Sequence, residues 1–282
     1  MGGPSAILAG DSLRRNGQSV SCNLASGMAD SSKPADEHSD APREDADIGT
    51  SSEDYARRFT GSVGRWFVTT QSRMTLSLLR ALPAGASILD VGGGHAQIAP
   101  PLIEAGYEVT VVGSDPVCAA RLEPWITQGR CTFEAVNLRA LPYADRSFDA
   151  VVCLRLLPHS VEWTGLIREL CRVARWAVVL DYPSSRSANV LAARMFHLKR
   201  NVELNTRRFL IFRPRDINTA FQNSGFSVRE ERPQFFLPMV LHRMGNHAAL
   251  SRVAETPGRL LGLTRWFGSP ILIRADRRGP SA

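Results

Sequence analysis

The chain has 282 residues, 44% of them hydrophobic, and a formal net charge of +7. This length and composition are typical of a globular protein with one large domain, or with one domain and additions. Because no run of about 18 apolar residues occurs, a transmembrane helix is not predicted. The first residues contain no basic start followed by an apolar stretch, so a secretory signal is not predicted either.

The positive charge is concentrated in the last third of the chain. Residues 184–282 contain 17 Lys and Arg against 6 Asp and Glu, whereas residues 29–54 contain 9 acids against 2 bases. A basic surface attracts anionic small molecules, nucleic acid or anionic lipid. The alternative is that this charge only keeps the surface soluble.

The cysteines indicate the redox environment. None of the five has C-x-x-C spacing, and most lie in apolar runs. This pattern is typical of reduced thiols in the core of a cytoplasmic protein, and neither disulfides nor a metal site is predicted. The cysteines are Cys22, Cys118, Cys131, Cys153 and Cys171.

The N-terminal part divides at about residue 52. Residues 1–52 are rich in Ser, Gly, Ala, Asp and Pro and almost without aromatics, so we expect a disordered tail. In residues 53–85 apolar side chains recur at helical spacing, with Gly61 and Gly64 as interruptions, which predicts one or two helices. Either these helices cover an edge of the sheet, or residues 55–64 form a lid over a ligand.

Strands and helices alternate from residue 87 onward. Short apolar runs predict strands at residues 88–91, 108–113, 131–136, 148–154 and 176–180, and helical segments separate them, including 116–128 and 161–172. This alternation is typical of an α/β protein with a doubly wound parallel sheet. Ligands of such sheets bind at the carboxyl ends of the strands.

The remaining chain adds two strands and two inserts. Residues 184–214 mix apolar and basic side chains. The insert at 235–263 begins with an apolar run that contains a proline, at residues 235–241, and ends in a helix predicted at residues 250–263. Between them we expect a helix at 215–224 and a strand at 226–232, and the last strand is expected at 270–274.

A glycine turn follows the first predicted strand, in the sequence DVGGGHA at residues 90–96. A strand, a glycine turn and a helix start bring backbone N–H groups close to an anionic ligand. Asp115 lies at the end of the second strand, 21 residues after Gly94, where an acid accepts hydrogen bonds from ribose hydroxyls; alternatively it caps a helix. The dinucleotide fingerprint G-x-G-x-x-G would place Gln97 at its last glycine, which disfavours a nicotinamide cofactor.

The turn resembles the D-x-G-x-G-x-G signature of class I S-adenosylmethionine-dependent methyltransferases, with Ala96 in place of the last glycine. Residues 141–152, LPYADRSFDAVV, and residues 169–173, ELCRV, are similar to two further stretches of that family. The likeness is greatest to its small-molecule, ubiquinone-biosynthesis-like "type 11" branch. The [D/N/S]-P-P-[Y/F] motif of enzymes that methylate amino groups of nucleic acids is absent, since residues 181–184 read DYPS.

The resemblance implies a Rossmann-like, seven-stranded mixed sheet with helices on both faces, and S-adenosylmethionine as cofactor. Asp90 and the turn would hold the methionine part of the cofactor, Asp115 the ribose, and Asn137 and Leu138 the adenine. Asn137 stands where the family often has Asp, and its amide oxygen can accept the same hydrogen bond. The residues implied to bind the cofactor are Asp90, Gly92, Gly93, Gly94, Asp115, Asn137, Leu138 and Leu154.

The activity implied is methyl transfer to a small-molecule acceptor. His159, on the loop after the fourth strand, is the candidate general base, or else a helix cap or a cofactor contact. Arg155, Lys199 and Arg200 suit an amphipathic, anionic acceptor that is lipid- or quinone-like, with peripheral membrane contact left open. The alternatives are a nucleic-acid methyltransferase and a non-catalytic partner protein that binds S-adenosylmethionine.

Overall fold

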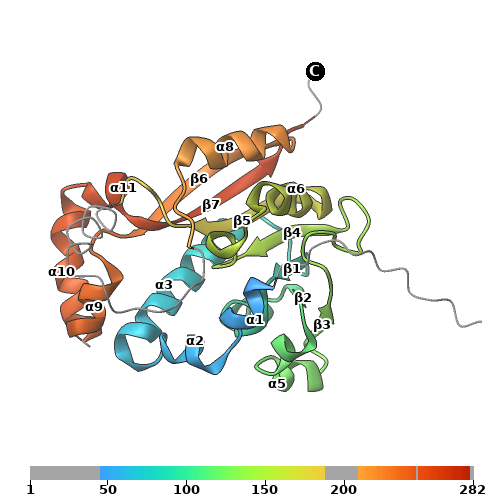
Figure 1. The fold of residues 1–282 in the computed structure, drawn as a ribbon, viewed down its shortest axis with the longest axis horizontal. Coiled ribbons are helices and arrows are strands. Elements are labelled where there is room, and N and C mark those ends of the chain that lie inside the picture. Colours follow the sequence, from blue (N-terminus) through green and yellow to red (C-terminus); the bar gives the residue numbers. More distant parts are fainter. Residues whose placement is uncertain (1–44, 188–208, 246, 280–282) are drawn as a thin grey trace, which may run out of the picture. The chain divides into compact units, whose positions relative to one another are not determined.

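The computed structural model describes residues 45–187, 209–245 and 247–279 (Figure 1). Seven strands form one sheet in the order β3-β2-β1-β4-β5-β7-β6. β7 is antiparallel to β5 and β6, and the other neighbouring strands are parallel. The strands are β1 (Ser87–Val91), β2 (Glu108–Gly113), β3 (Cys131–Ala135), β4 (Phe148–Cys153), β5 (Ala174–Tyr182), β6 (Phe226–Phe235) and β7 (Ser269–Arg277).

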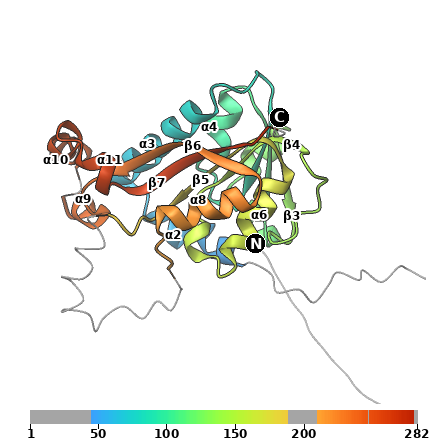
Figure 2. The ribbon, with the colours of Figure 1, turned by 90° about the horizontal axis from the view of Figure 1, so that it is seen from above.

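Helices lie on both faces of this sheet (Figure 2). The α-helices are α1 (Ala46–Thr50), α2 (Glu53–Arg57), α3 (Gly61–Leu79), α4 (Ala99–Glu104), α5 (Glu123–Thr127), α6 (Trp163–Val173), α8 (Pro214–Asn223), α9 (Met239–Gly245), α10 (Ala248–Leu260) and α11 (Leu263–Phe267). Three short 3-10 helices are η1 (Gly93–His95), η2 (Pro116–Ala119) and η3 (Leu157–His159). Among the described residues, no helix is long and apolar enough to cross a bilayer.

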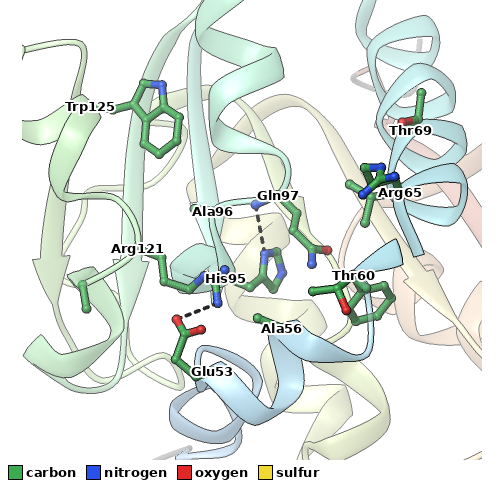
Figure 3. Close-up of a pocket in the computed structure, with 13 residues that line it drawn as sticks. Glu53, Ala56, Thr60, Arg65, Thr69, His95, Ala96, Gln97, Arg121 and Trp125 are labelled. Carbon is green, nitrogen blue, oxygen red and sulfur yellow. Dashed lines mark hydrogen bonds and ion pairs between the residues drawn. The ribbon is translucent and has the colours of Figure 1, made fainter. Parts of the chain in front are cut away.

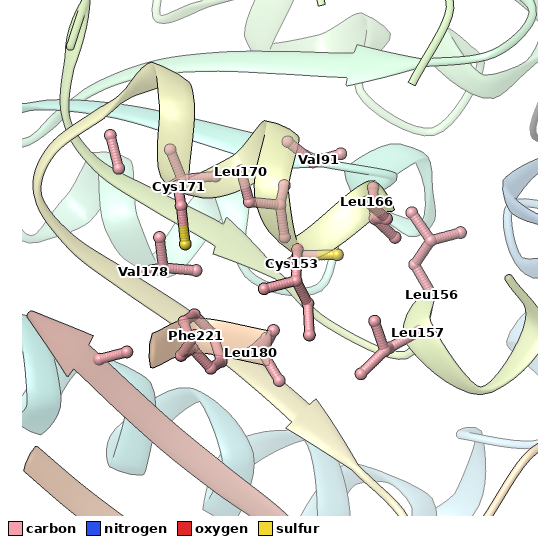
Figure 4. Close-up of a cluster of buried hydrophobic side chains, with 14 of the residues drawn as sticks. Val91, Cys153, Leu156, Leu157, Leu166, Leu170, Cys171, Val178, Leu180 and Phe221 are labelled. Carbon is pink, nitrogen blue, oxygen red and sulfur yellow. The ribbon is translucent and has the colours of Figure 1, made fainter. Parts of the chain in front are cut away.

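The central strands are buried on both faces because successive side chains point to opposite sides. Leu89 of β1 belongs to the core under α6 and α8, whereas its neighbour Ile88 belongs to the core under α3 and α4. Figure 4 shows the first core, with Val91, Cys153, Leu180, Leu166, Leu170 and Phe221. This two-sided burial explains why the strands read as continuous apolar runs.

The predicted doubly wound α/β fold, with its seven-stranded mixed sheet, is confirmed. Two predicted helices are each divided. Residues 116–128 form η2 and α5, and Pro124 near the start of α5 lacks the N–H that a continuous helix would need. Residues 250–263 belong to α10 and α11, which are separated at Gly262, where φ is +71°. A glycine in this left-handed conformation ends one helix before the next begins.

Of the two glycines expected to interrupt the N-terminal helices, Gly61 lies at the break between α2 and α3, whereas Gly64 has another role. Gly61 begins α3, and Gly64 lies inside it. A Cβ atom at Gly64 would lie 2.2 Å from the carbonyl carbon of Phe59, so glycine is needed there for close packing. The glycine at position 64 therefore reflects close packing of α3 against the residues just before it.

The expected tail boundary at residue 52 is wrong, because residues 46–50 form α1 and Ser52 caps α2. Asp47 on α1 is fully buried. Its carboxylate accepts hydrogen bonds from the Ser114 N–H at 2.7 Å and from the Ser114 hydroxyl at 2.5 Å. These donors at the end of β2 order part of a segment whose small, polar and aromatic-poor composition predicted a disordered tail. Residues 1–44 lie outside the described residues.

Replacing Asp47 with Ala should destabilise the fold, because the partly buried N–H and hydroxyl of Ser114 would lose their acceptor. We expect the free energy of unfolding to fall by about 1–3 kcal/mol in urea denaturation. Asp54→Ala is the matched control, since the Asp54 side chain is 89% exposed and, within the described residues, pairs with the exposed Arg57. Equal effects of the two substitutions would contradict the role given to Asp47.

Candidate functional site

The glycine turn after β1 has a conformation that few other residues tolerate. Gly92 has φ of +73°, and its N–H donates to the carbonyl oxygen of Val112 on β2 at 2.8 Å. A Cβ atom at Gly92 would lie 3.0 Å from Leu156 and 3.6 Å from Asp47. Ala96, which replaces the last glycine of the motif, also has a positive φ of 54°. The turn therefore keeps its left-handed geometry at the cost of some strain at this alanine.

Asp90 on β1 is a buried carboxyl group beside this turn. It is 1% exposed, and a Cβ atom at Gly93 would lie 2.1 Å from its Oδ2. Burial raises its pKa to about 7, although Arg155 acts in the opposite direction. Neither carboxyl oxygen has a hydrogen-bond partner among the described residues. Since a buried acceptor without a partner is costly, a ligand that supplies a donor would be favoured here.

Arg155 follows β4 and takes part in a buried network. Its backbone φ is +61°, and its N–H donates to Asp181 Oδ1 at 2.6 Å. The guanidinium donates from Nε and Nη2 to Gln71 Oε1 at 3.0 and 2.7 Å, and Gln71 Nε2 donates to Asp181 Oδ2 at 2.7 Å. The guanidinium also lies over the Phe59 ring, 4.5 Å from its centroid. The network thus joins α3, β5 and the segment after β4.

One nitrogen of the same guanidinium could bind a ligand. Arg155 Nη1 is buried and has no hydrogen-bond partner among the described residues. Burial lowers the pKa of Arg155, but a guanidinium still stays protonated at neutral pH. Asp90 and Arg155 interact electrostatically, so an anionic and a cationic group both lie near the turn. This pair complements a ligand that carries an ammonium and a carboxylate.

Several of these residues were not identified from the sequence. Asp181 could have been, because it ends the fifth apolar strand at the edge where ligands were expected. Gln71 gave no signal, since it lies among the helical residues before β1, and Phe59 was expected only as part of the possible lid at residues 55–64. Arg155 was expected to border the acceptor, and the structure places it in the network with Gln71 and Asp181.

The residues expected to bind the nucleoside make hydrogen bonds within their own segments or are buried in the core. Asp115 caps η2, its Oδ1 accepting from the Val117 N–H at 2.8 Å, which is the alternative given above. The Asn137 side-chain oxygen accepts from the Arg139 N–H at 3.0 Å. Leu138 and Leu154 are buried in the two cores.

α1 lies over the turn and the end of β2. A Cβ atom at Gly94 would lie 2.4 Å from Ser51 Oγ, and one at Gly113 would lie 3.1 Å from Asp47 Oδ2. The carboxylate nearest to the end of β2 is therefore supplied by Asp47, 66 residues before Gly113 in the chain. In this conformation α1 fills the space beside Gly92 and Gly94.

A cavity of about 560 Å³ lies on another side of the turn (Figure 3). Residues of α2 and the start of α3 line one wall, and His95, Gln97, Arg121 and Trp125 line the other. Glu53 bridges the two walls through an ion pair with Arg121 at 2.9 Å. None of the residues expected to bind the cofactor lines this cavity.

His159 ends η3 beside the described residues near the end of the insert at 184–214. Its ring packs edge-on against Phe209, with the centroids 5.6 Å apart. The Leu210 N–H donates to the Pro158 carbonyl oxygen at 2.8 Å. Lys199 and Arg200, the other residues expected to contact the acceptor, lie outside the described residues.

Asp90 and His95 should give folding stability opposite pH dependences. Folding raises the pKa of Asp90 from 3.8 to about 7, so between these values the native state binds more protons than the unfolded state. The contribution of Asp90 to stability therefore falls as the pH rises through this range. Burial, with Arg155 nearby, lowers the pKa of His95 from 6.5 to about 3, so its contribution rises with pH between those values.

Urea denaturation from about pH 4 to pH 8 would separate the two groups. Relative to the wild type, Asp90→Asn should remove the fall in stability, and His95→Gln should remove the rise. Parallel pH profiles for the wild type and Asp90→Asn would contradict the raised pKa.

Comparison with known proteins identifies the family. A model described as "Methyltransferase domain" matches residues 69–231, which is more than half of the chain. A demethylmenaquinone methyltransferase from a Roseiflexus species is 31% identical over 141 residues, covering 48% of this chain and 59% of that protein. A ubiquinone biosynthesis O-methyltransferase from Xanthomonas axonopodis is 24% identical over 169 residues, covering 56% of this chain and 70% of that protein.

A solved structure shares the fold. Magnesium protoporphyrin IX methyltransferase from Synechocystis, crystallised with bound SAH, aligns with a TM-score of 0.57 at 18% identity, covering 82% of this chain and 97% of that one. The chain spans less than two thirds of the length of the Roseiflexus relative. The family match nevertheless covers the glycine turn, β1 to β5 and the network around Arg155. The chain belongs to the methyltransferase domain family.

Proposed function

We propose that this protein transfers the methyl group of S-adenosylmethionine to a small-molecule acceptor. The observation that carries the proposal is the pair of charged groups beside the glycine turn. Asp90 has two carboxyl oxygens, and Arg155 one guanidinium nitrogen, without hydrogen-bond partners among the described residues. The amino-acid end of S-adenosylmethionine carries an ammonium and a carboxylate, and these match the two groups in charge and hydrogen bonding. The family membership supports the same cofactor.

Each part of the cofactor has candidate residues in this chain. Asp90 and residues 92–94 would hold the amino-acid end, with Arg155 added to the set expected from the sequence. Asp115 remains the candidate for the ribose, and Asn137 with Leu138 for the adenine. Leu154 would lie under the same edge, because it directly follows β4.

When bound, S-adenosylmethionine supplies a methyl group already activated by a sulfonium. The chain's own residues then mainly align donor and acceptor, and positioning of this kind contributes about 7–11 kcal/mol in favourable cases. Burial of the site under α2 and the start of α3 would exclude water. In this proposal residues 55–64 act as the lid that covers the bound cofactor.

His159 is the candidate general base. It would be needed only for an acceptor whose attacking atom carries a proton of high pKa. Its support is its place: it follows β4 on η3, and the residues that flank 188–208 meet there. The Phe212 N–H donates to the Pro183 carbonyl oxygen at 3.0 Å, so the two described ends of the insert lie side by side. The described end that follows residues 188–208 lies beside His159, because Phe209 packs against its ring.

The acceptor we infer is amphipathic and anionic, of a lipid- or quinone-like kind. Demethylmenaquinone and ubiquinone-biosynthesis methyltransferases among the relatives support this class. The basic residues of the insert would bind an acidic head, and its apolar residues a hydrophobic body. The alternatives are a nucleic-acid methyltransferase and a non-catalytic S-adenosylmethionine-binding partner, because a fold alone does not fix the reaction.

Gly92→Ala should weaken binding of S-adenosylmethionine at least about tenfold in calorimetry, because the new methyl group would enter the space beside the turn. Gly85→Ala is the matched control. Gly85 has φ of +74° and Gly92 +73°, so both substitutions carry similar backbone strain, but a Cβ atom at Gly85 would have no neighbour within 4 Å. Equal affinities in the two folded variants, or tighter binding of NAD(H), would contradict the cofactor assignment.

Asp47→Ala should have the opposite effect and strengthen binding of S-adenosylmethionine. If the cofactor displaces α1 from the turn, contacts that hold α1 there oppose binding, and affinity rises about tenfold for each 1.4 kcal/mol of contact energy removed. Asp54→Ala is again the control. Weaker binding by Asp47→Ala would instead make Asp47 part of the ribose site.

A further inference from the structure

α10 presents its apolar side chains away from the protein. Its inward-facing residues are Ser251, Glu255 and Gly258, all buried. Its outward stripe consists of Leu250, Val253, Leu260 and the following Leu261, which are 62%, 69%, 82% and 73% exposed. Amphipathic helices of soluble proteins normally have the reverse orientation, with the apolar stripe against the core. The stripe on α10 therefore needs an explanation outside the core.

The inward face of α10 is fixed by specific contacts. Glu255 is fully buried, and its carboxylate accepts from the N–H groups of Phe236 and Leu237, each at 2.9 Å. His242 Nε2 on α9 lies 2.9 Å from Glu255 Oε1. A Cβ atom at Gly258 would lie 2.9 Å from the Phe236 ring, so the helix packs closely there. These contacts would be lost if α10 turned its apolar stripe inward.

The two neighbouring helices extend the exposed apolar surface. Val240 and Met244 on α9 are 61% and 78% exposed, and Trp266 on α11 is 66% exposed. α9, α10 and α11 lie together at one end of the sheet in both views (Figures 1 and 2). We call the exposed apolar residues of these three helices the α9–α11 surface.

Charge indicates which partner this surface fits. Residues 239–267 contain four arginines, Arg243, Arg252, Arg259 and Arg265, and one acid, Glu255, which is buried. Arg252 and Arg259 are exposed, and helical spacing places both on the flank of α10 beside Val253 and Leu260. In a symmetric dimer through this surface, the arginines of two copies would repel one another. An anionic bilayer instead offers phosphates to the arginines and acyl chains to the apolar residues.

We propose that the α9–α11 surface docks the protein on an anionic lipid bilayer. Leu250, Val253 and Leu260 enter the boundary between headgroups and acyl chains, and Trp266 lies at the headgroup level. The arginine side chains extend along this boundary and keep their guanidinium groups at the phosphates. The attachment is peripheral, and it does not depend on which cofactor or acceptor the protein uses.

Co-sedimentation of the full chain with vesicles tests the proposal. The protein should bind vesicles of equal parts phosphatidylcholine and phosphatidylglycerol, and bind pure phosphatidylcholine at least about tenfold more weakly, with binding decreasing as salt is added. The triple variant Leu250→Ser, Val253→Ser and Leu260→Ser should lose at least about tenfold in affinity for the anionic vesicles. The double variant Arg252→Gln and Arg259→Gln should lose the preference for anionic lipid.

A tryptophan pair provides the matched control. Trp266 and Trp176 are 66% and 57% exposed, but Trp176 lies at the start of β5, outside the α9–α11 surface. Trp266→Ser should weaken vesicle binding and Trp176→Ser should not, and bromine-labelled lipids should quench the wild type more than Trp266→Ser.

Three outcomes would overturn the proposal. They are equal binding to both kinds of vesicle, a dimer in light scattering that the triple variant dissociates, and a melting temperature lowered by the triple variant far more than by Trp176→Ser. The second would assign the surface to another copy of the chain. The third would mean that the stripe is covered within the chain.

Discussion

The hydrogen bonds among Arg155, Gln71 and Asp181 fix the parts of the site relative to one another. Gln71 lies on α3, Asp181 near the end of β5, and Arg155 directly after β4, so three segments far apart in sequence meet at one amide group. The neutral amide accepts from the guanidinium and donates to the carboxylate, so both charged groups remain hydrogen-bonded although they are buried. With Arg155 held in this way, its remaining guanidinium nitrogen and the Asp90 carboxyl are kept near the turn without neutralising each other directly.

The covering of the turn by α1 follows from the glycine that ends β2. Gly113 has no side chain, and the Asp47 carboxylate lies against it and accepts from the next residue, Ser114. An acidic side chain at position 113 would repel Asp47 and compete for the same donors. The position of α1 therefore depends on a glycine at the end of β2. It also explains why the acid expected at this strand end, Asp115, is free to cap η2 instead.

The sheet was predictable because its central strands are buried on both faces and therefore appear as short apolar runs separated by turns. The glycine turn was predictable for a similar reason, since its backbone conformation restricts which residues fit. Asp47 and Gln71 were not predictable, because their partners are distant in sequence and neither lies in a periodic or motif position. The breaks at Pro124 and Gly262 were visible in the sequence, but apolar spacing on either side of each suggested one continuous helix.

The α9–α11 surface and the site are connected through α3. Trp66 and Phe67 on α3 pack against Phe235, Met239 and Ala248 at the base of α9 and α10. Further along the same helix, Gln71 binds Arg155 and Asp181. One rigid helix therefore sets the orientation of the docking surface relative to the carboxyl ends of the strands. If the acceptor is lipid-soluble, as proposed, docking would concentrate the protein where that acceptor is dissolved. Docking would raise the rate of encounter with the acceptor, whereas affinity for a water-soluble cofactor would be unchanged.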